Sequence, residues 1–100
     1  MKTLFLGDVS PSRTSKEMFR NKEVERLFKD TVPMMMESEF TCVNLECALT
    51  EYPTPIKKMG PPLCAPIETA EILKGLNVKL CSLSNNHSFD YGIEGMKDTF

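Results

Sequence analysis

The chain has 100 residues and a formal net charge of −2, with 41% hydrophobic and 26% charged residues. This balance is typical of a globular domain or a piece of one, and it excludes disordered and fibrous proteins. The only basic doublet is Lys57-Lys58, so we expect no nucleic-acid partner. An acidic protein that processes phosphate groups normally takes its positive charge from metal ions.

The start of the chain resembles neither a signal peptide nor a membrane anchor. The apolar residues 3–6 are too few for the core of a signal peptide. No apolar stretch approaches the ~20 residues that a membrane helix needs. We therefore expect the chain, as given, to be soluble and cytoplasmic.

The first half of the chain predicts two strands with helix between them. A short apolar run over residues 2–6, ended by Gly7, is typical of a buried parallel strand. Residues 16–36 are predicted to be mainly helical, with Pro33 kinking or restarting the helix. A second strand is predicted over residues 40–45. The apolar face of the helical segment is formed by Phe19, Val24, Leu27 and Phe28.

The second half predicts a loop, a helix, a third strand and the start of another helix. Residues 52–66 hold five of the seven prolines and are predicted to form an irregular loop. A helix over residues 67–76 precedes a strand over residues 78–83, and a last helix begins near Ile93. Strands that alternate with helices predict an α/β fold, a βαβαβ parallel sheet with crossover helices. The expected buried side of the helix over residues 67–76 consists of Ala70, Ile72, Leu73 and Leu76.

None of the four cysteines belongs to a C-x-x-C pair, which argues against a zinc knuckle. Cys42 and Cys81 lie within apolar runs and are expected to be buried as small hydrophobic residues. Cys47 and Cys64 lie in or beside loops. A disulfide between these two is the less favoured alternative to free thiols.

Polar side chains follow each of the three predicted strands. In parallel α/β sheets, ligands bind beyond the carboxyl ends of the strands, so the three segments are predicted to meet at one edge. Oxygen ligands together with an imidazole favour Mn, Fe, Zn, Mg or Ca over a metal bound by thiolates, and Mn or Fe suit the mixture best. The candidate residues at this edge are Asp8, Asn44, Glu46, Asn85, Asn86 and His87.

Each of these segments also has an ordinary structural explanation. Asp8 follows a glycine and suits a turn, and Glu46 would lie in solvent just past its strand. Asn85 and Asn86 tolerate left-handed backbone in a tight turn, while His87 packs beside them. Because all three segments end at the same edge of one sheet, a metal site is the preferred interpretation.

Three motifs resemble those of one protein family over residues 4–99. They are G-D-V starting at Gly7, N-L-E starting at Asn44 and N-N-H-x-x-D-Y-G starting at Asn85. In this order and placement they resemble the poly-gamma-glutamate capsule synthesis protein CapA family, and through it the calcineurin-like metallophosphoesterases. The resemblance implies a partial calcineurin-like metallophosphoesterase fold, with residues 1–100 as the N-terminal part of a single domain that is truncated at its C-terminus.

The resemblance also implies roles for individual residues. Asp8, Glu46 and Asn86 would be metal ligands, and His87 would be the catalytic residue that assists the leaving group. Asp90 would orient His87 or cap the following helix, and the cap is preferred. Two divalent metal ions, Mn, Fe or Zn, are expected in the complete domain. Asn44 and Asn85 would play secondary roles.

The sequence departs from the broader superfamily at two places. Ser10 stands where a histidine is expected, and the later histidine motifs do not occur before Phe100. The implied function is a metal-dependent hydrolase acting on a phosphoester or an acidic polymer, and this chain alone would be inactive or weak. The alternative is a non-catalytic binding module of the same fold for an acidic polymer or a protein partner.

Many relatives are exported or membrane-associated. An open sheet edge leads us to expect self-association.

Overall fold

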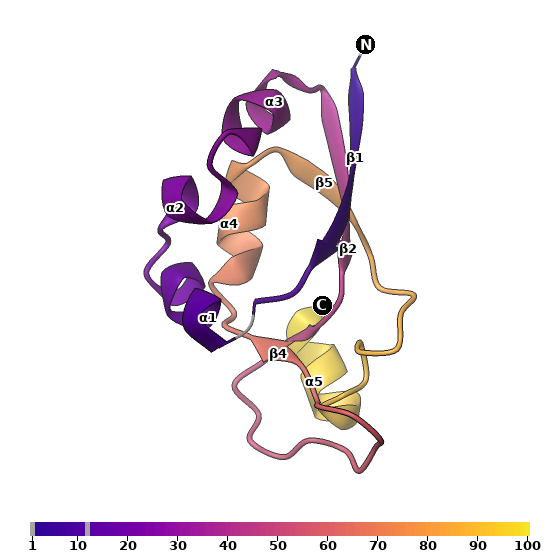
Figure 1. Cartoon of the computed structure of the whole chain (residues 1–100). Coiled ribbons are helices and arrows are strands. Elements are labelled where there is room, and N and C mark those ends of the chain that lie inside the picture. The colour runs from indigo at the N-terminus through magenta and orange to yellow at the C-terminus, as the bar shows by residue number, and fades with distance from the viewer. Residues whose placement is uncertain (1, 12) are drawn as a thin grey trace.

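The computed structural model describes residues 2–11 and 13–100, with a parallel sheet of three strands at its centre. The strands are β1 (Thr3–Val9), β2 (Phe40–Leu45) and β5 (Val78–Ser82), in the spatial order β1-β2-β5 (Figure 1). Both pairings, β1 with β2 and β2 with β5, are parallel. The predicted α/β fold with a parallel sheet and intervening helices is confirmed.

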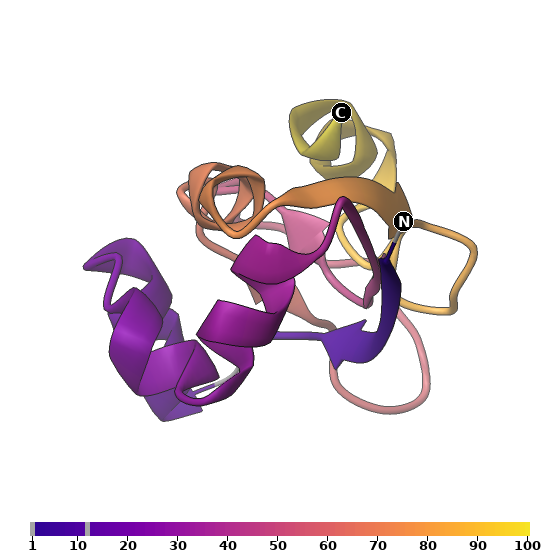
Figure 2. The same ribbon diagram turned by 90° about the horizontal axis from the view of Figure 1, so that it is seen from above.

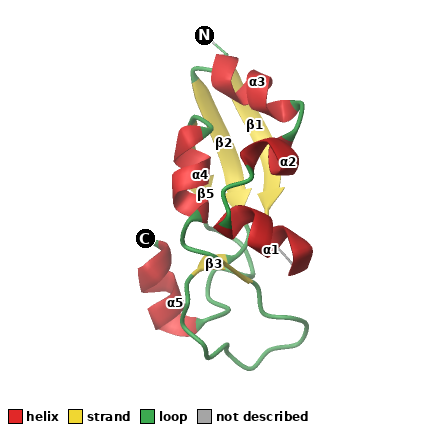
Figure 3. Cartoon of the chain, turned by 90° about the vertical axis from the view of Figure 1, so that its left-hand side faces the viewer, coloured by secondary structure: helices red, strands yellow, loops and turns green. Residues whose placement is uncertain are grey.

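Four helices cover one face of this sheet. Figure 2 shows them together on one side of the strands, and Figure 3 shows them in front of the sheet. Their buried side chains Phe19, Met35, Ile72 and Leu76 form a core cluster, against which Leu4, Leu6 and Val9 of β1 pack. The four helices are α1 (Arg13–Arg20), α2 (Val24–Phe28), α3 (Thr31–Glu37) and α4 (Thr69–Gly75).

The segment between β1 and β2 differs from the predicted single helix. It consists of α1, α2 and α3, because Lys22 and Lys29 adopt left-handed φ angles of 55° and 46° that interrupt the helical backbone. The predicted restart near Pro33 is confirmed, since α3 begins at Thr31. Proline fits there because the amide N–H groups of a first helical turn need no partner within the helix. All four residues of the predicted apolar face belong to or pack against the core cluster.

Strand β1 is longer than predicted and contains a bulge. Phe5 pairs with Cys42 and Asp8 with Asn44, so β1 fits one more residue than β2 between these two pairs. Bulges accept glycine readily, and Gly7 lies within this one. The extra residue lets Leu6 and Val9 both face the helices while Asp8 stays level with Asn44. The expectation that Gly7 ends the strand is therefore wrong.

The prediction for α4 is correct except at one residue. Ile72, Leu73 and Leu76 are buried, whereas Ala70 is exposed. Cys42 is buried and Cys81 is half-buried, and all four cysteines are free thiols. Burial raises the pKa of the Cys47 thiol to about 12, so this thiol stays protonated.

Below the main sheet, a small parallel sheet closes the base of the proline-rich loop. It pairs β3 (Ala48–Leu49) with β4 (Cys64–Ala65), and α5 (Gly92–Thr99) packs against β3. Gly95 faces β3, where a Cβ at its position would lie 3.7 Å from the Cβ of Ala48; a Cβ there would also clash with Tyr91 at the start of α5, at 2.5 Å. No helix within residues 2–11 and 13–100 has the length and apolar character to cross a membrane.

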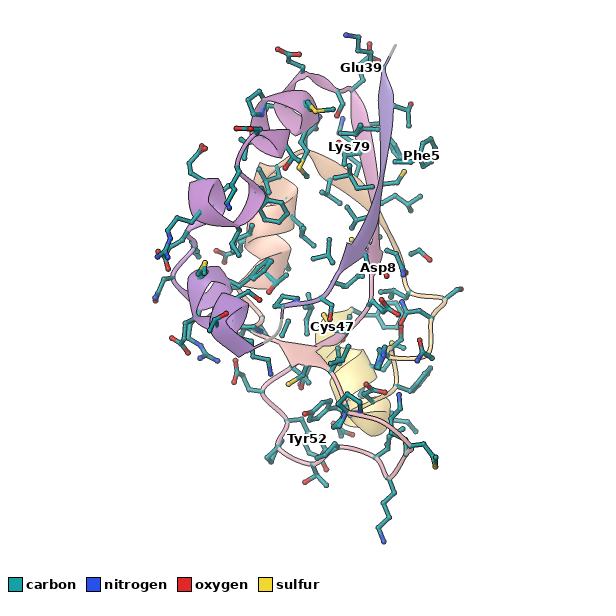
Figure 4. All side chains as sticks on the ribbon, viewed as in Figure 1. Phe5, Asp8, Glu39, Cys47, Tyr52 and Lys79 are labelled. Carbon is teal, nitrogen blue, oxygen red and sulfur yellow. The ribbon has the colours of Figure 1, made fainter. Side chains whose placement is uncertain are left out.

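The face of the main sheet opposite α1–α4 is bare. Phe5, Cys42 and Leu80 form one row across the three strands, and the side chains of Phe5 and Leu80 are 76% and 55% exposed. Figure 4 shows Phe5 pointing away from the helices. Parallel sheets are normally covered on both faces, so this row is an apolar surface that invites association.

We predict that the 100-residue chain self-associates through this bare face. Sedimentation should show oligomers of the wild-type chain at high concentration, and the double variant Phe5→Lys/Leu80→Lys should be shifted toward monomer, because charge replaces the apolar row. Met59→Lys is a matched control, since Met59 is 95% exposed on the proline-rich loop, outside this row. A wild-type chain that sediments as a single monomer would contradict the prediction.

Candidate functional site

The three strand ends are joined by a chain of side-chain hydrogen bonds. The Nδ2 of Asn44 donates to Oδ1 of Asp8 at 2.8 Å, and the Nδ2 of Asn85 donates to Oδ1 of Asn44 at 3.0 Å. The Nδ2 of Asn85 also donates to the carbonyl oxygen of Leu45 at 2.9 Å. The sheet register accounts for the first bond, because Asp8 and Asn44 are partners across β1 and β2. Three of the residues predicted to meet at this edge therefore do so.

Glu46 lies beside Asp8 because the β1–β2 pairing continues past the end of β2. The backbone N–H of Glu46 donates to the carbonyl oxygen of Val9 at 3.0 Å. A hydrogen bond with the Asp8 carboxyl raises the pKa of Glu46, whereas hydrogen bonds from Asn44 and then from Glu46 lower the pKa of Asp8. The pair therefore holds its last proton on Glu46 while Asp8 is ionised. Two carboxyl groups this close repel each other when both are charged, unless a cation neutralises them.

His87 is held by a buried carboxylate. Its Nδ1 lies 2.6 Å from Oδ2 of Asp90, whose side chain has no solvent exposure. The backbone N–H of His87 donates to Oδ1 of Asn85 at 3.0 Å, which fixes the turn that carries the ring. With the Asp90 carboxylate as acceptor, Nδ1 carries the hydrogen, and Nε2 is the nitrogen left for proton exchange. Through Asn85 and Asn44, hydrogen bonds connect this turn to Asp8.

Asp90 does not cap the last helix, and the preferred interpretation of this residue is wrong. Residue Tyr91 occupies the N-terminal cap position of α5, without a side-chain cap bond. Asp90 instead accepts hydrogen bonds from Lys58, from the backbone N–H of Leu63 and from His87. Burial raises the pKa of Asp90, but these hydrogen bonds outweigh it and the pKa is lowered. The competing interpretation, that Asp90 orients His87, is the one that the contacts support.

Asn86 occupies an exposed position in the turn between Asn85 and His87. Its carbonyl oxygen accepts a hydrogen bond from Nζ of Lys58 at 3.0 Å. The asparagine whose side-chain amide belongs to the hydrogen-bond chain between the strand ends is Asn85. Asn86, the next residue, stays a predicted metal ligand. Residue Lys58 was missed as part of the site, since a basic doublet in a proline-rich loop carries no local signal that it contacts a residue 32 positions away.

The side chains at the edge suit a cation that prefers oxygen ligands. Asp8 and Glu46 supply two neighbouring carboxyl groups, and the side-chain amides of Asn44 and Asn85 are bonded in a chain to Asp8. Oxygen donors of this kind suit Mn, Fe or Zn, whereas a metal that prefers thiolate ligands would need cysteine side chains. Within the described ranges 2–11 and 13–100, no group of three or more His, Cys, Asp or Glu side chains is gathered closely enough to hold a metal. The predicted metal ligands are therefore not gathered into a metal site by these described residues alone, and their role stays a prediction.

We predict that Asp90 makes folding stability depend on acidic pH. A carboxyl group whose folded-state pKa lies below its usual value of 3.8 stabilises the fold above that value, and this stabilisation is lost as the pH falls through the folded-state pKa. Denaturant midpoints measured from neutral pH down to below pH 3.8 should fall more steeply for the wild type than for Asp90→Asn. Glu94→Gln, at an exposed position of α5, is the control. Equal steepness for wild type and Asp90→Asn would contradict this role of Asp90.

Comparison with known proteins agrees with the motifs at the strand ends. The chain is 30% identical over 98 residues to "PGA biosynthesis protein CapA" of Bacillus subtilis (strain 168), and 30% identical over 99 residues to "Capsule biosynthesis protein CapA" of Bacillus anthracis. These alignments cover 95% and 94% of this chain, but 25% and 24% of the two proteins, so the chain spans about a quarter of the length of these curated relatives. Residues 2–100 match the family model described as bacterial capsule synthesis protein PGA_cap. The chain thus belongs to the PGA_cap family of bacterial capsule synthesis proteins.

Proposed function

We propose that this chain supplies the N-terminal part of a metal-dependent phosphoesterase-type site in a capsule synthesis protein. The observation that carries the proposal is the meeting of two kinds of group at one sheet edge. Asp8 and Glu46 form a carboxyl pair there, and hydrogen bonds through Asn44 and Asn85 connect Asp8 to the turn that carries His87 and Asp90. Cation ligands and a proton donor are the two components that phosphoester hydrolysis needs.

In this proposal Asp8, Glu46 and Asn86 hold the metal ions, Mn, Fe or Zn. When bound, such ions supply positive charge and Lewis acidity to a phosphoryl group. The asparagine chain positions the carboxylates for this task, because Asn44 holds Asp8 and is itself held by Asn85. A cation would also relieve the repulsion between the Asp8 and Glu46 carboxyl groups, which favours the ionised form of Glu46.

His87 acts on the leaving group of the substrate. Asp90 holds the Nδ1–H and so leaves Nε2 to donate a proton to the leaving oxygen, or to hold a hydrogen bond to it as negative charge develops. A general acid needs a fixed ring, and two contacts provide it here. They are the bond from Nδ1 to Asp90 and the bond from the backbone N–H to Asn85.

The substrate class that fits is a phosphoester or an acidic polymer. The names of the curated relatives connect them with capsule and PGA biosynthesis, which is consistent with a polymer substrate. Since this chain spans about a quarter of those proteins, the remaining metal ligands would come from residues outside it. We expect the 100-residue chain to bind Mn or Zn weakly and to hydrolyse phosphoesters poorly, and a protein of the relatives' full length to do both better.

We predict that substitutions at the site separate metal binding from turnover. In a full-length protein that contains this segment, Asp8→Ala and Asn86→Ala should lower the metal content, because each removes a ligand. His87→Ala should spare the metal and lower turnover by about 10²–10⁴-fold, the usual cost of losing a general acid. Elemental analysis of each purified variant, together with a phosphodiester assay, measures both effects.

The matched control is Asp98→Ala, which removes an exposed carboxylate from α5 that is not among the site residues. If the wild-type full-length protein binds no divalent metal, or if Asp8→Ala keeps its metal, the catalytic proposal fails. A non-catalytic module that binds an acidic polymer or a protein partner would then replace it.

A further inference from the structure

The proline-rich loop between β3 and β4 is attached at several points to the turn that carries His87. The Nζ of Lys58 lies 2.5 Å from Oδ1 of Asp90, and the backbone N–H of Leu63 donates to Oδ2 of Asp90 at 2.7 Å. The backbone N–H of Ile56 donates to the carbonyl oxygen of Asp90 at 2.8 Å. Three residues of the loop therefore converge on one residue of the turn.

Lys58 is the charged member of this attachment. Its side chain is only 18% exposed, although lysine normally extends into water, and its partner Asp90 is fully buried. The same Nζ also donates to the carbonyl oxygen of Asn86 at 3.0 Å, so Lys58 bridges the beginning and the end of the turn from Asn86 to Asp90. Burying two charges is costly unless each is paired and hydrogen-bonded, and these contacts meet that condition.

The two carboxylate oxygens of Asp90 have separate partners. Oδ1 accepts from Lys58, whereas Oδ2 accepts from Leu63 and from Nδ1 of His87. The ammonium of Lys58 therefore supplies the counter-charge that keeps Asp90 an anion while Oδ2 holds the imidazole. No second lysine or arginine side chain is bonded to Asp90 within the described residues 2–11 and 13–100.

We propose that Lys58 is a positioning residue, which fixes His87 through Asp90 and ties the proline-rich loop to the site. Loss of its ammonium leaves a buried carboxylate without its lysine counter-charge. Water that enters to solvate Asp90 competes with Nδ1 of His87 for this carboxylate, so the ring loses its fixed orientation. The consequence for turnover rests on the proposed function, whereas the effects on the ring and the loop do not.

His87 is the only histidine in the chain, so its ring can be observed directly. The ring signals in the NMR spectrum of a histidine-labelled chain report how tightly the ring is held. We expect one sharp set of ring signals in the wild type and signals broadened by exchange in Lys58→Met. Lys58→Arg should restore the sharp set, because arginine keeps the charge and the donors. Lys57→Met is the matched control, since Lys57 is the exposed neighbour in the same loop.

Hydrogen exchange reports on the loop in the same samples. The amides of Ile56 and Leu63 should exchange roughly tenfold faster in Lys58→Met, as expected for one lost hydrogen bond to a charged group. The control Lys57→Met should leave both amides unchanged. If Lys58→Met does not fold, Lys58→Gln takes its place, because it removes the charge but keeps a polar group of similar length.

The proposal is overturned if the variant without the charge at position 58 keeps the sharp ring signals of the wild type, or if both amides keep their wild-type protection. Neither readout needs metal or substrate, so failure here is distinct from failure of the proposed hydrolysis. In the full-length protein, the variant should lower kcat and keep the wild-type metal content. A loss of metal equal to that of Asp8→Ala would show that Lys58 serves the metal ligands instead, and would also overturn the proposal.

Discussion

A carboxylate that no solvent reaches must find all its partners within the protein, and much of the lower half of this structure is arranged around one such group. Asp90 has no solvent exposure and is bonded to Lys58, to the backbone of Leu63 and to His87. These bonds connect the proline-rich loop, the start of β4 and the turn before α5. The same carboxylate that holds these segments together also orients the only imidazole, so the packing of this region and the chemistry of the site are linked.

The positions of the candidate site residues also depend on the register of the parallel sheet. The bulge in β1 places Asp8 level with Asn44, and the pairing that continues past β2 brings Glu46 beside them. A sheet without the bulge would place a different residue of β1 opposite Asn44. The polar groups at the carboxyl edge therefore lie together as a consequence of backbone pairing, and the amides of Asn44 and Asn85 then fix the side chains. Membership of the PGA_cap family gives this arrangement a biological setting in capsule synthesis.

The uncovered face of the main sheet carries an apolar row beside the candidate site residues. The apolar row of Phe5, Cys42 and Leu80 lies next to the polar row of Asp8 and Asn44 on the same strands. Whatever covers the apolar row would therefore also lie beside the carboxyl pair. This adjacency is compatible with the proposed function, in which further metal ligands would come from residues outside the chain.

The sequence by itself determined the parallel strands, the helices between them and the polar strand ends, because these depend on local apolar runs and on the residues that end them. Only the tertiary structure decided the bulge in β1, the left-handed backbone at Lys22 and Lys29, and the partners of Asp90. Local pattern favours Asp90 as a helix cap, since aspartate before a helix commonly has that role. Lys58, 32 positions earlier, overrides it, because a buried charge is held by its strongest partner wherever that partner lies in the sequence.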